Sequence, residues 1–190
     1  MADLKSILSE ISRVQLSDDR LVIPSHKIES GWLGESGASE AEIASAERRL
    51  GVQLPPSYRA FLAQSNGFDH IGAFIYRLYN ASEIDWFRVR NQDWIEAYQI
   101  EDDISPEEHL AAPDDCVRFR AGYLSSCLQI SEEGDSAVVL LNPEVVNDEG
   151  EWETWFFANW RPGAQRFPSF RSYVESELES IKDLLSARGS

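Results

Sequence analysis

Neighbouring acidic residues are the groups whose spacing in this sequence comes nearest to that of a catalytic or metal site. They occur as Asp102-Asp103, Glu107-Glu108, Asp114-Asp115 and the run Glu132-Glu133-Gly134-Asp135. Glycosidases use paired carboxylates, and Mg²⁺ and Ca²⁺ bind carboxylate oxygens. A Ca²⁺ loop, however, alternates acids with a fixed glycine and ends in a glutamate, and none of these segments does so. We therefore predict no metal site and interpret the acids as solvated side chains.

Histidines and cysteines offer no catalytic pattern either. His26, His70 and His109 lie in no motif with a nucleophile and at no metal-ligand spacing, so each is predicted at the surface or in a loop. Cys127 lies in a strand pattern and is predicted to be buried and apolar, whereas Cys116 stands beside two acids that disfavour a thiolate. The glycines are scattered, without a phosphate-binding loop. We predict no catalytic residue and no cofactor.

The formal net charge is −16, from 33 acidic and 17 basic residues. Such a chain repels phosphate backbones and anionic membranes, so we predict neither nucleic acid nor membrane as a partner. It suits a basic protein, because complementary fields speed encounter and exclude wrong partners. Solubility alone is the other interpretation of the same charge.

The acid-rich segments 101–115 and 132–135 therefore become a predicted partner surface. Trp86, Trp94 or Trp160 would serve it as an anchor, since tryptophan often carries much of the binding energy at an interface. We expect one or two of these rings there and the others in the core. The predicted contact residues are Asp102, Asp103, Glu107, Glu108, Asp114, Asp115, Glu132, Glu133 and Asp135.

Residues 39–51 show the clearest signals for a helix near the start of the chain. Ser39 is placed to cap it, and Glu42 can reach back to complete a capping box. Gly51 suits the left-handed residue that ends a helix. The apolar face recurs at helical spacing, with Ile43, Ala46 and Leu50.

A second helix is predicted after Pro55-Pro56. A residue before proline is driven out of the helical region, so 52–54 is extended, whereas proline costs little in the first helical turn. Asn66-Gly67 ends this helix. Its apolar face contains Tyr58, Phe61 and Leu62.

The remaining patterns predict an α+β fold, with N-terminal helices followed by an antiparallel meander of about four to six strands and a closing C-terminal helix. Apolar spacing predicts a helix over 3–14, a helix over 83–99 with a break near Asn91, and a last helix capped by Ser169. Residues 17–37 are predicted as a connection, and 101–115 as an exposed loop. Asn142-Pro143 is predicted to end a strand. The predicted strands are 74–79, 124–130, 137–141 and 152–157.

Several of these segments together resemble the SUKH superfamily, which includes a fungal cell-wall-assembly regulator and many bacterial toxin-immunity proteins. The opening motif is Leu50-Gly51, Leu54-Pro55-Pro56-Ser57-Tyr58, Phe61-Leu62 and Ser65-Asn66-Gly67. Later, LQISEEGDSAVVLLNP and WETWFFANWRPGAQRFPSF resemble the family's later strands and the start of its last helix, so the likeness covers roughly 32–185. The resemblance assigns structural roles to Gly51, Leu54, Pro55, Pro56, Tyr58, Phe61, Leu62, Asn66, Gly67, Gly134, Asp135, Trp155 and Phe170.

The resemblance implies a non-catalytic protein-binding domain, and we expect an immunity protein that occludes the active site of a cognate toxin, such as a nuclease. The alternative is a regulatory scaffold of the cell-wall-assembly-regulator type. A third hypothesis, an enzyme for a small substrate, requires a pocket that holds His70 or His109 against a carboxylate.

Length and composition predict one domain with an N-terminal addition. We expect a helical extension over 1–25 and the SUKH-like domain over 26–190, as a monomer or weak homodimer. No stretch approaches the roughly 20 apolar residues of a membrane span, and the first residues lack a secretory core. We therefore expect a cytoplasmic protein with reduced thiols.

Overall fold

A five-stranded antiparallel sheet forms the centre of the computed structural model, which describes residues 3–98 and 103–188. Its strands are β3 (Asp85–Trp86), β4 (Leu128–Gln129), β5 (Ala137–Val146), β6 (Trp152–Ala158) and β7 (Ala164–Phe167). They lie in the sheet in sequence order, and every neighbouring pair is antiparallel. The predicted α+β class, with helices first, a meander next and a closing helix, is confirmed.

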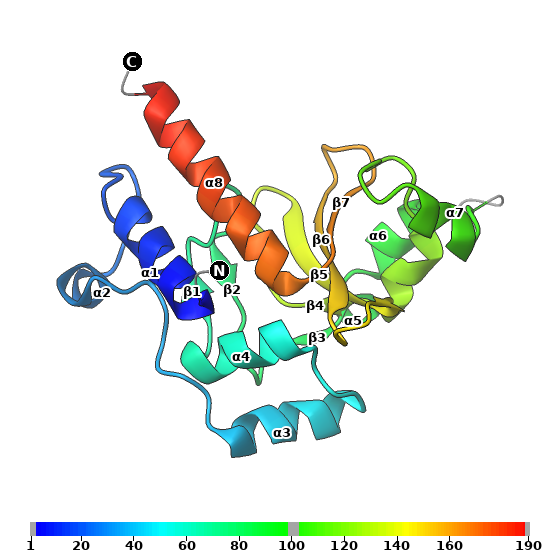
Figure 1. Ribbon diagram of the computed structural model, residues 1–190, viewed down its shortest axis with the longest axis horizontal. Coiled ribbons are helices and arrows are strands. Elements are labelled where there is room, and N and C mark those ends of the chain that lie inside the picture. The colour runs from blue at the N-terminus through cyan, green and yellow to red at the C-terminus, as the bar shows by residue number, and fades with distance from the viewer. Residues whose placement is uncertain (1–2, 99–102, 189–190) are drawn as a thin grey trace.

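Four helices lie on one side of this sheet (Figure 1), which we call the α8 face. They are α1 (Leu4–Gln15), α3 (Glu40–Leu50), α4 (Pro56–Gln64) and α8 (Phe170–Arg188). Side chains alternate along a strand, so Val139, Leu141 and Phe156 all join the core on this side. Helix α1 packs against α4 and α8 and buries its apolar stripe in the same core.

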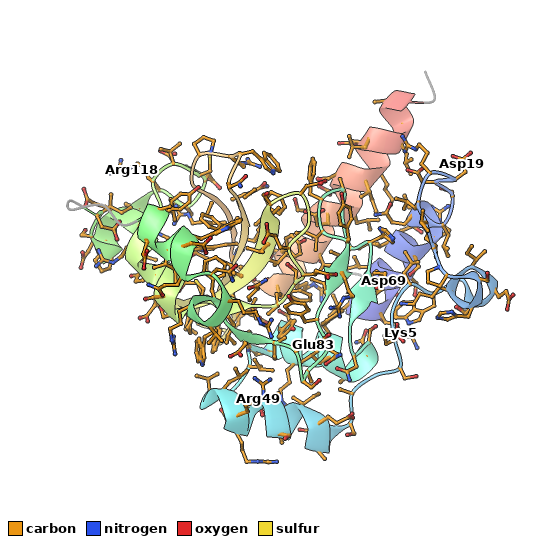
Figure 2. The ribbon with its side chains drawn as sticks, turned by 180° about the vertical axis from the view of Figure 1, so that it is seen from behind. Lys5, Asp19, Arg49, Asp69, Glu83 and Arg118 are labelled. Carbon is orange, nitrogen blue, oxygen red and sulfur yellow. The ribbon has the colours of Figure 1, made fainter. Side chains whose placement is uncertain are left out.

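Short elements cover the opposite face, which we call the α7 face. They are α5 (Phe87–Arg90), α6 (Gln92–Ala97), α7 (Pro106–Ala111) and the 3₁₀ helix η1 (Ala121–Ser126). Val138, Leu140 and Phe157 point to this side and meet Phe87 and Leu124 in a second, smaller core. Seen from behind, Asp19 near α1 and Arg118 near α7 lie at opposite sides of the molecule (Figure 2).

The predicted helix pair has the predicted ends. The Ser39 backbone N–H donates to Glu42 Oε2 at 2.7 Å, and the Glu42 N–H donates to Ser39 Oγ at 3.3 Å, which completes the capping box. Gly51 ends α3 at φ +74°, a left-handed conformation that glycine adopts without a Cβ clash. Pro55 and Pro56 open α4. The helices predicted over 3–14 and after Ser169 are also present.

Three predictions about helices need correction. Residues 101–115 are not a loop throughout, because α7 lies within them and is stabilised by a second capping box, Ser105 with Glu108. The segment predicted as one helix over 83–99 begins with a turn, continues as strand β3 and then forms two helices that break at Asn91, the predicted position; residue 99 lies outside the described residues. The connection over 17–37 also contains a short helix, α2 (Ser25–Ser30).

The strand predictions need three corrections. Only β2 (Arg77–Leu78) forms within 74–79, paired with β1 (Phe68–Asp69), and 124–130 begins inside η1. Asn142-Pro143 does not end a strand, because β5 continues past it to Val146 through an irregularity in its pairing. Such a bulge leaves ladder positions unpaired, so a residue without an N–H fits there. Strand β7 was not predicted.

Candidate functional site

The predicted contact acids divide into structural and exposed groups. Asp103 accepts hydrogen bonds from the backbone N–H groups of Ala121 at 3.1 Å and Gly122 at 2.8 Å, so it holds the start of η1. Glu108 caps α7, and its hydrogen bonds with Ser105 lower its pKa. Glu107 is exposed on α7, and Asp102 lies outside the described residues.

The other five predicted acids are exposed and lie at one end of the sheet: Asp114, Asp115, Glu132, Glu133 and Asp135. The β6–β7 turn connects their two segments, because Ala164 N–H donates to the Cys116 carbonyl at 2.9 Å and Asn159 N–H donates to the Ser136 carbonyl at 3.0 Å. Figure 1 shows the orange β6–β7 turn at the same end of the sheet as the β4–β5 turn and next to the green loop that follows α7. The fold thus brings together acids that are far apart in the sequence.

Three exposed rings lie beside these acids. Phe74, Tyr76 and Trp160, here called the aromatic patch, are 44%, 43% and 49% exposed. The ring centroids of Phe74 and Trp160 are 5.2 Å apart, and the buried Phe156 lies 6.2 and 6.1 Å below them. Of the three tryptophans considered as anchors, Trp160 is the exposed one, while Trp86 and Trp94 are half-buried against the cores.

Asp135 ties the aromatic patch together. Its Oδ2 accepts a hydrogen bond from the Tyr76 hydroxyl at 2.6 Å, and its backbone carbonyl accepts one from Trp160 Nε1 at 2.7 Å. Asp135 and Ser136 are left-handed at φ +48° and +56°, which a side chain makes costly. A Cβ on Gly134 would lie 2.7 Å from the Phe74 carbonyl oxygen, so this turn position requires glycine. These constraints hold the turn against the 70–76 loop.

A buried polar network lies on the α7 face around Glu153. Its Oε2 accepts hydrogen bonds from His109 Nε2 at 3.0 Å, Trp155 Nε1 at 2.7 Å and Asn142 Nδ2 at 3.1 Å. Arg166, whose side chain is 2% exposed, donates from Nη1 to the His109 carbonyl at 2.8 Å and lies 3.4 Å from Glu153 Oε1. Burial raises the pKa of Glu153, but these hydrogen bonds outweigh it and leave the pKa lowered.

This network fixes His109 in one tautomer. Arg120 N–H donates to His109 Nδ1 at 2.9 Å, so Nδ1 carries a lone pair and the proton lies on Nε2, which donates to Glu153. Both ring nitrogens are thereby occupied, and the side chain is fully buried. The prediction of a surface or loop position for His109 is wrong, because α7 turns this residue inward.

A cavity of about 490 Å³ opens beside the network, with Glu153 and Arg166 at its polar side and Leu110, Val146 and Phe167 among its apolar walls. His109 does not line it, so the histidine–carboxylate contact that an enzyme requires is present without a free nitrogen facing the cavity. Within residues 3–98 and 103–188, no cluster of three metal-ligating side chains exists. His70 lies in a loop, as predicted, and His26 is exposed on α2.

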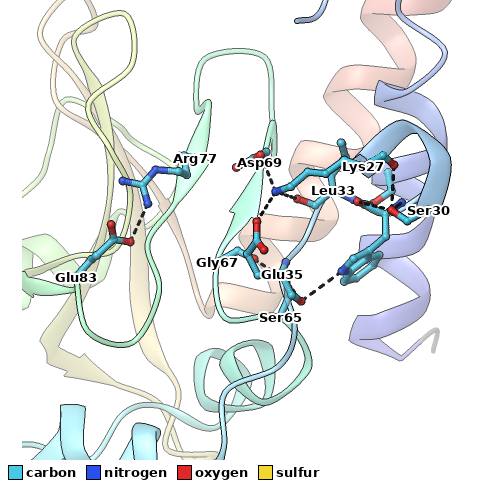
Figure 3. Close-up of polar contacts among 11 residues, drawn as sticks. Lys27, Ser30, Leu33, Glu35, Ser65, Gly67, Asp69, Arg77 and Glu83 are labelled. Atoms are coloured by element: carbon cyan, nitrogen blue, oxygen red, sulfur yellow. Dashed lines mark hydrogen bonds and ion pairs between the residues drawn. The ribbon is translucent and has the colours of Figure 1, made fainter. Parts of the chain in front are cut away.

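A second buried charge holds the α8 side together (Figure 3). Lys27 Nζ donates to the Leu33 carbonyl at 3.0 Å and lies 2.7 Å from Asp69 Oδ2 and 2.6 Å from Glu35 Oε1. Burial lowers the pKa of Lys27, but the two carboxylates raise it further, so the amine stays charged. This residue was not predicted, and its role is to attach α2 to β1.

The residues that carry the family resemblance lie where a folding motif requires them. The large side chains are fully buried at Tyr58, Phe61, Leu62, Trp155 and Phe170. Asn66 Oδ1 accepts a hydrogen bond from Ala81 N–H at 2.8 Å, and Gly67 is left-handed at φ +109°. Leu54 is buried, and Gly134 and Asp135 form the turn beside the aromatic patch.

These features define an α+β domain with a buried structural network and an exposed acidic and aromatic end. The chain belongs to the SMI1 / KNR4 family (SUKH-1), whose model matches residues 37–176. Membership supports a non-catalytic immunity or regulatory domain in general terms, and protein–protein interaction as its mode of action. No curated protein matches the chain. No described helix is long and apolar enough to cross a membrane.

Sequence reasoning missed Phe74 and Tyr76 as surface residues, because a run of aromatic and β-branched residues is typical of a buried strand. It also missed the inward position of His109. A signal for the latter was present, since Ser105-Pro106-Glu107-Glu108 has the spacing of a capping box and predicts a helix from Pro106.

Proposed function

We propose that this protein is an immunity-type binding domain that neutralises a basic toxin domain, such as a nuclease, by covering its active site. The observation that supports this proposal is the convergence of five exposed acids at one end of the sheet, next to the aromatic patch. We propose further that it acts in the cytoplasm as a monomer or weak homodimer.

The charge of this end suits a surface that binds phosphates. Nucleases carry basic substrate sites, so an acidic inhibitor matches their field and is steered toward the active site. The net charge of −16 adds a long-range attraction toward a basic partner. Glu132 contributes less than its neighbours, because its carboxylate lies 3.3 Å from Arg77 Nε.

The first test is capture of partners from the native cells on the tagged protein, with washes at low and high salt. The proposal expects one stoichiometric basic partner that is released at high salt, is toxic when expressed alone and is harmless when this protein is co-expressed. A salt-insensitive set of housekeeping partners, none of them toxic, would reject it in favour of the regulatory scaffold.

The second test changes charge at constant shape. Replacing Asp114, Asp115, Glu132 and Glu133 by Asn or Gln should slow association with the toxin at low salt by about 10-fold and flatten its salt dependence. The matched control removes the same charge from acids that are exposed elsewhere, namely Glu29, Asp148, Glu149 and Glu179. Equal association rates for both variants would show that this end of the sheet is not the contact.

A further inference from the structure

The aromatic patch is the part of the surface where rings are exposed together rather than singly. Phe74, Tyr76 and Trp160 come from two different turns, and exposed apolar rings in contact mark interaction sites more often than scattered ones do. Tyr76 and Trp160 already have hydrogen-bond partners in Asp135, so their orientation is fixed before any partner binds. A fixed ring loses little conformational entropy on binding.

The patch has a carboxylate but no cation. Elsewhere in the described chain an arginine lies over a ring four times, as Arg77 over Tyr79, Arg88 over Trp86, Arg90 over Tyr79 and Arg120 over Tyr123. No such pair is found for the patch rings among the described residues. The cations next to the patch rings in sequence are engaged elsewhere, because Arg77 pairs with Glu83 at 2.7 Å and Arg161 donates to Gln165 at 2.8 Å.

We propose that the aromatic patch and Asp135 form the contact site for an arginine side chain of the basic partner, an assignment that rests on the proposed function. The guanidinium stacks on the exposed face of Trp160 or Tyr76 and pairs with the Asp135 carboxylate at the ring edge. Arginine fits better than lysine because its planar group stacks on aromatic rings and donates two parallel hydrogen bonds to a carboxylate.

The acidic surroundings favour a positively charged side chain of the partner at this site. Glu133 and Asp135 are exposed on the same turn, so an anionic side chain is repelled and a neutral aromatic one leaves the carboxylates without partners. Arginine is also enriched among the residues that dominate interfaces, as are the Tyr and Trp it would meet. A nuclease presents arginines in its phosphate site, so such a contact covers that site directly.

The test is an NMR titration of the full chain with three blocked tetrapeptides, acetyl-Gly-X-X-Gly-amide, in which X is arginine, lysine or citrulline. Citrulline has the shape of arginine without its charge. We expect the Trp160 indole signal, assigned through Trp160→Phe, to shift saturably with the arginine peptide, several-fold more weakly with lysine and not with citrulline. Equal affinities for arginine and lysine would overturn the assignment.

Two matched variants separate the site from the general charge. Asp135→Asn keeps an oxygen for the Tyr76 hydroxyl but removes the carboxylate, and should weaken arginine-peptide binding about 2- to 5-fold. Asp148→Asn removes the same charge at an exposed turn between β5 and β6 and should leave binding unchanged. The same loss in both variants would show that the peptide responds to net charge alone, and would reject the site.

Failure of this inference is distinguishable from failure of the proposed function. If Trp160→Leu and Asp135→Asn neutralise the captured toxin as well as the parent protein does, the patch is rejected while the immunity function stands. If the arginine peptide binds at the patch but no toxin partner is captured, the site stands as an arginine-binding surface and the immunity function is rejected.

Discussion

The two faces of the sheet are held together by different means. The α8 face is covered by helices of nine to nineteen residues whose apolar stripes meet in one large core. The α7 face is covered by helices of four to six residues, and beside its smaller core it buries the network of Glu153, Arg166 and His109. Short helices bury few apolar contacts, so hydrogen bonds from side chains to their backbone contribute a larger share of their stability.

This difference indicates where the loss of a buried charged group should lower stability most. Arg166 donates to the carbonyls of His109, in the last turn of α7, and of Ala112, at its C-cap, so one guanidinium holds the C-terminal end of α7 against β7. On the α8 face most of the packing is apolar, and the buried Lys27 ion pairs attach α2 to β1. Removal of a single polar side chain should therefore lower the free energy of unfolding most on the α7 face.

Glu153→Ala gives the largest expected effect. It leaves the buried Arg166 guanidinium without its carboxylate and removes the acceptor for His109, Trp155 and Asn142. We expect the free energy of unfolding to fall by about 3–5 kcal/mol. Chemical denaturation monitored by circular dichroism measures it.

The matched control is the next residue on the same strand. Thr154 is equally buried but points to the α8 face, where its hydroxyl makes one long hydrogen bond of 3.5 Å to the Trp152 carbonyl. Thr154→Val should cost less than about 1 kcal/mol. Equal losses for the two variants would contradict the distinction between the faces.

The pH dependence of stability should have opposite signs on the two faces. On α8, burial raises the pKa of Glu177 from 4.5 to about 7, although the Ala73 N–H opposes it. The folded state therefore holds this proton more tightly, and its contribution of about 3 kcal/mol is present below pH 4.5 and lost as the pH rises through 7. The pKa of Glu153 is lowered, so its contribution is present above pH 4.5 and lost in more acidic solution.

Glu177→Gln tests this sign directly. The variant should be more stable than the parent at pH 8 and should lose the decline between pH 4.5 and 7, as measured by denaturation at a series of pH values. Glu179→Gln, two residues further along the helix and exposed, is the control and should change neither. A parent protein whose stability rises over this window would contradict the assignment.

The smallest expected effect comes from the two capping boxes. Ser39→Ala and Ser105→Ala each remove one cap and should cost about 1 kcal/mol. Helix α3 is part of the large core, so its loss should lower global stability, whereas six-residue α7 should open locally. Hydrogen exchange distinguishes the two: faster exchange confined to α7 in Ser105→Ala is expected, and uniform change in both variants would be against it.

The sequence predicted the α8 face well because its signals are local. The cap at Ser39, the glycine at position 51 and the prolines at 55 and 56 each act within a few residues, and all of them are confirmed in the structure. The prediction of the α7 face failed for two reasons: the local capping-box signal at Ser105 was not used, and strand β4 depends on distant partners. Strand β4 has two residues and exists because β3 and β5 pair with it, which no local pattern encodes.

The candidate site shows the same division. The acids at 114–115 and 132–135 were predicted from composition, but their approach in space depends on hydrogen bonds through the β6–β7 turn. Asp103 was placed in the same set, although its carboxylate is occupied by backbone donors of η1. The sequence shows which residues are charged. It does not show which carboxylates accept hydrogen bonds from the backbone, because that depends on the fold.

The left-handed turn at Asp135 and Ser136 has a consequence for how such a surface changes during evolution. Its shape is held by Gly134, by left-handed backbone and by the backbone hydrogen bond from Asn159 to Ser136. Replacing Tyr76 removes its hydrogen bond to Asp135 but leaves these backbone constraints in place. A lineage can therefore replace the rings one at a time and acquire a new partner while the scaffold beneath them keeps its shape.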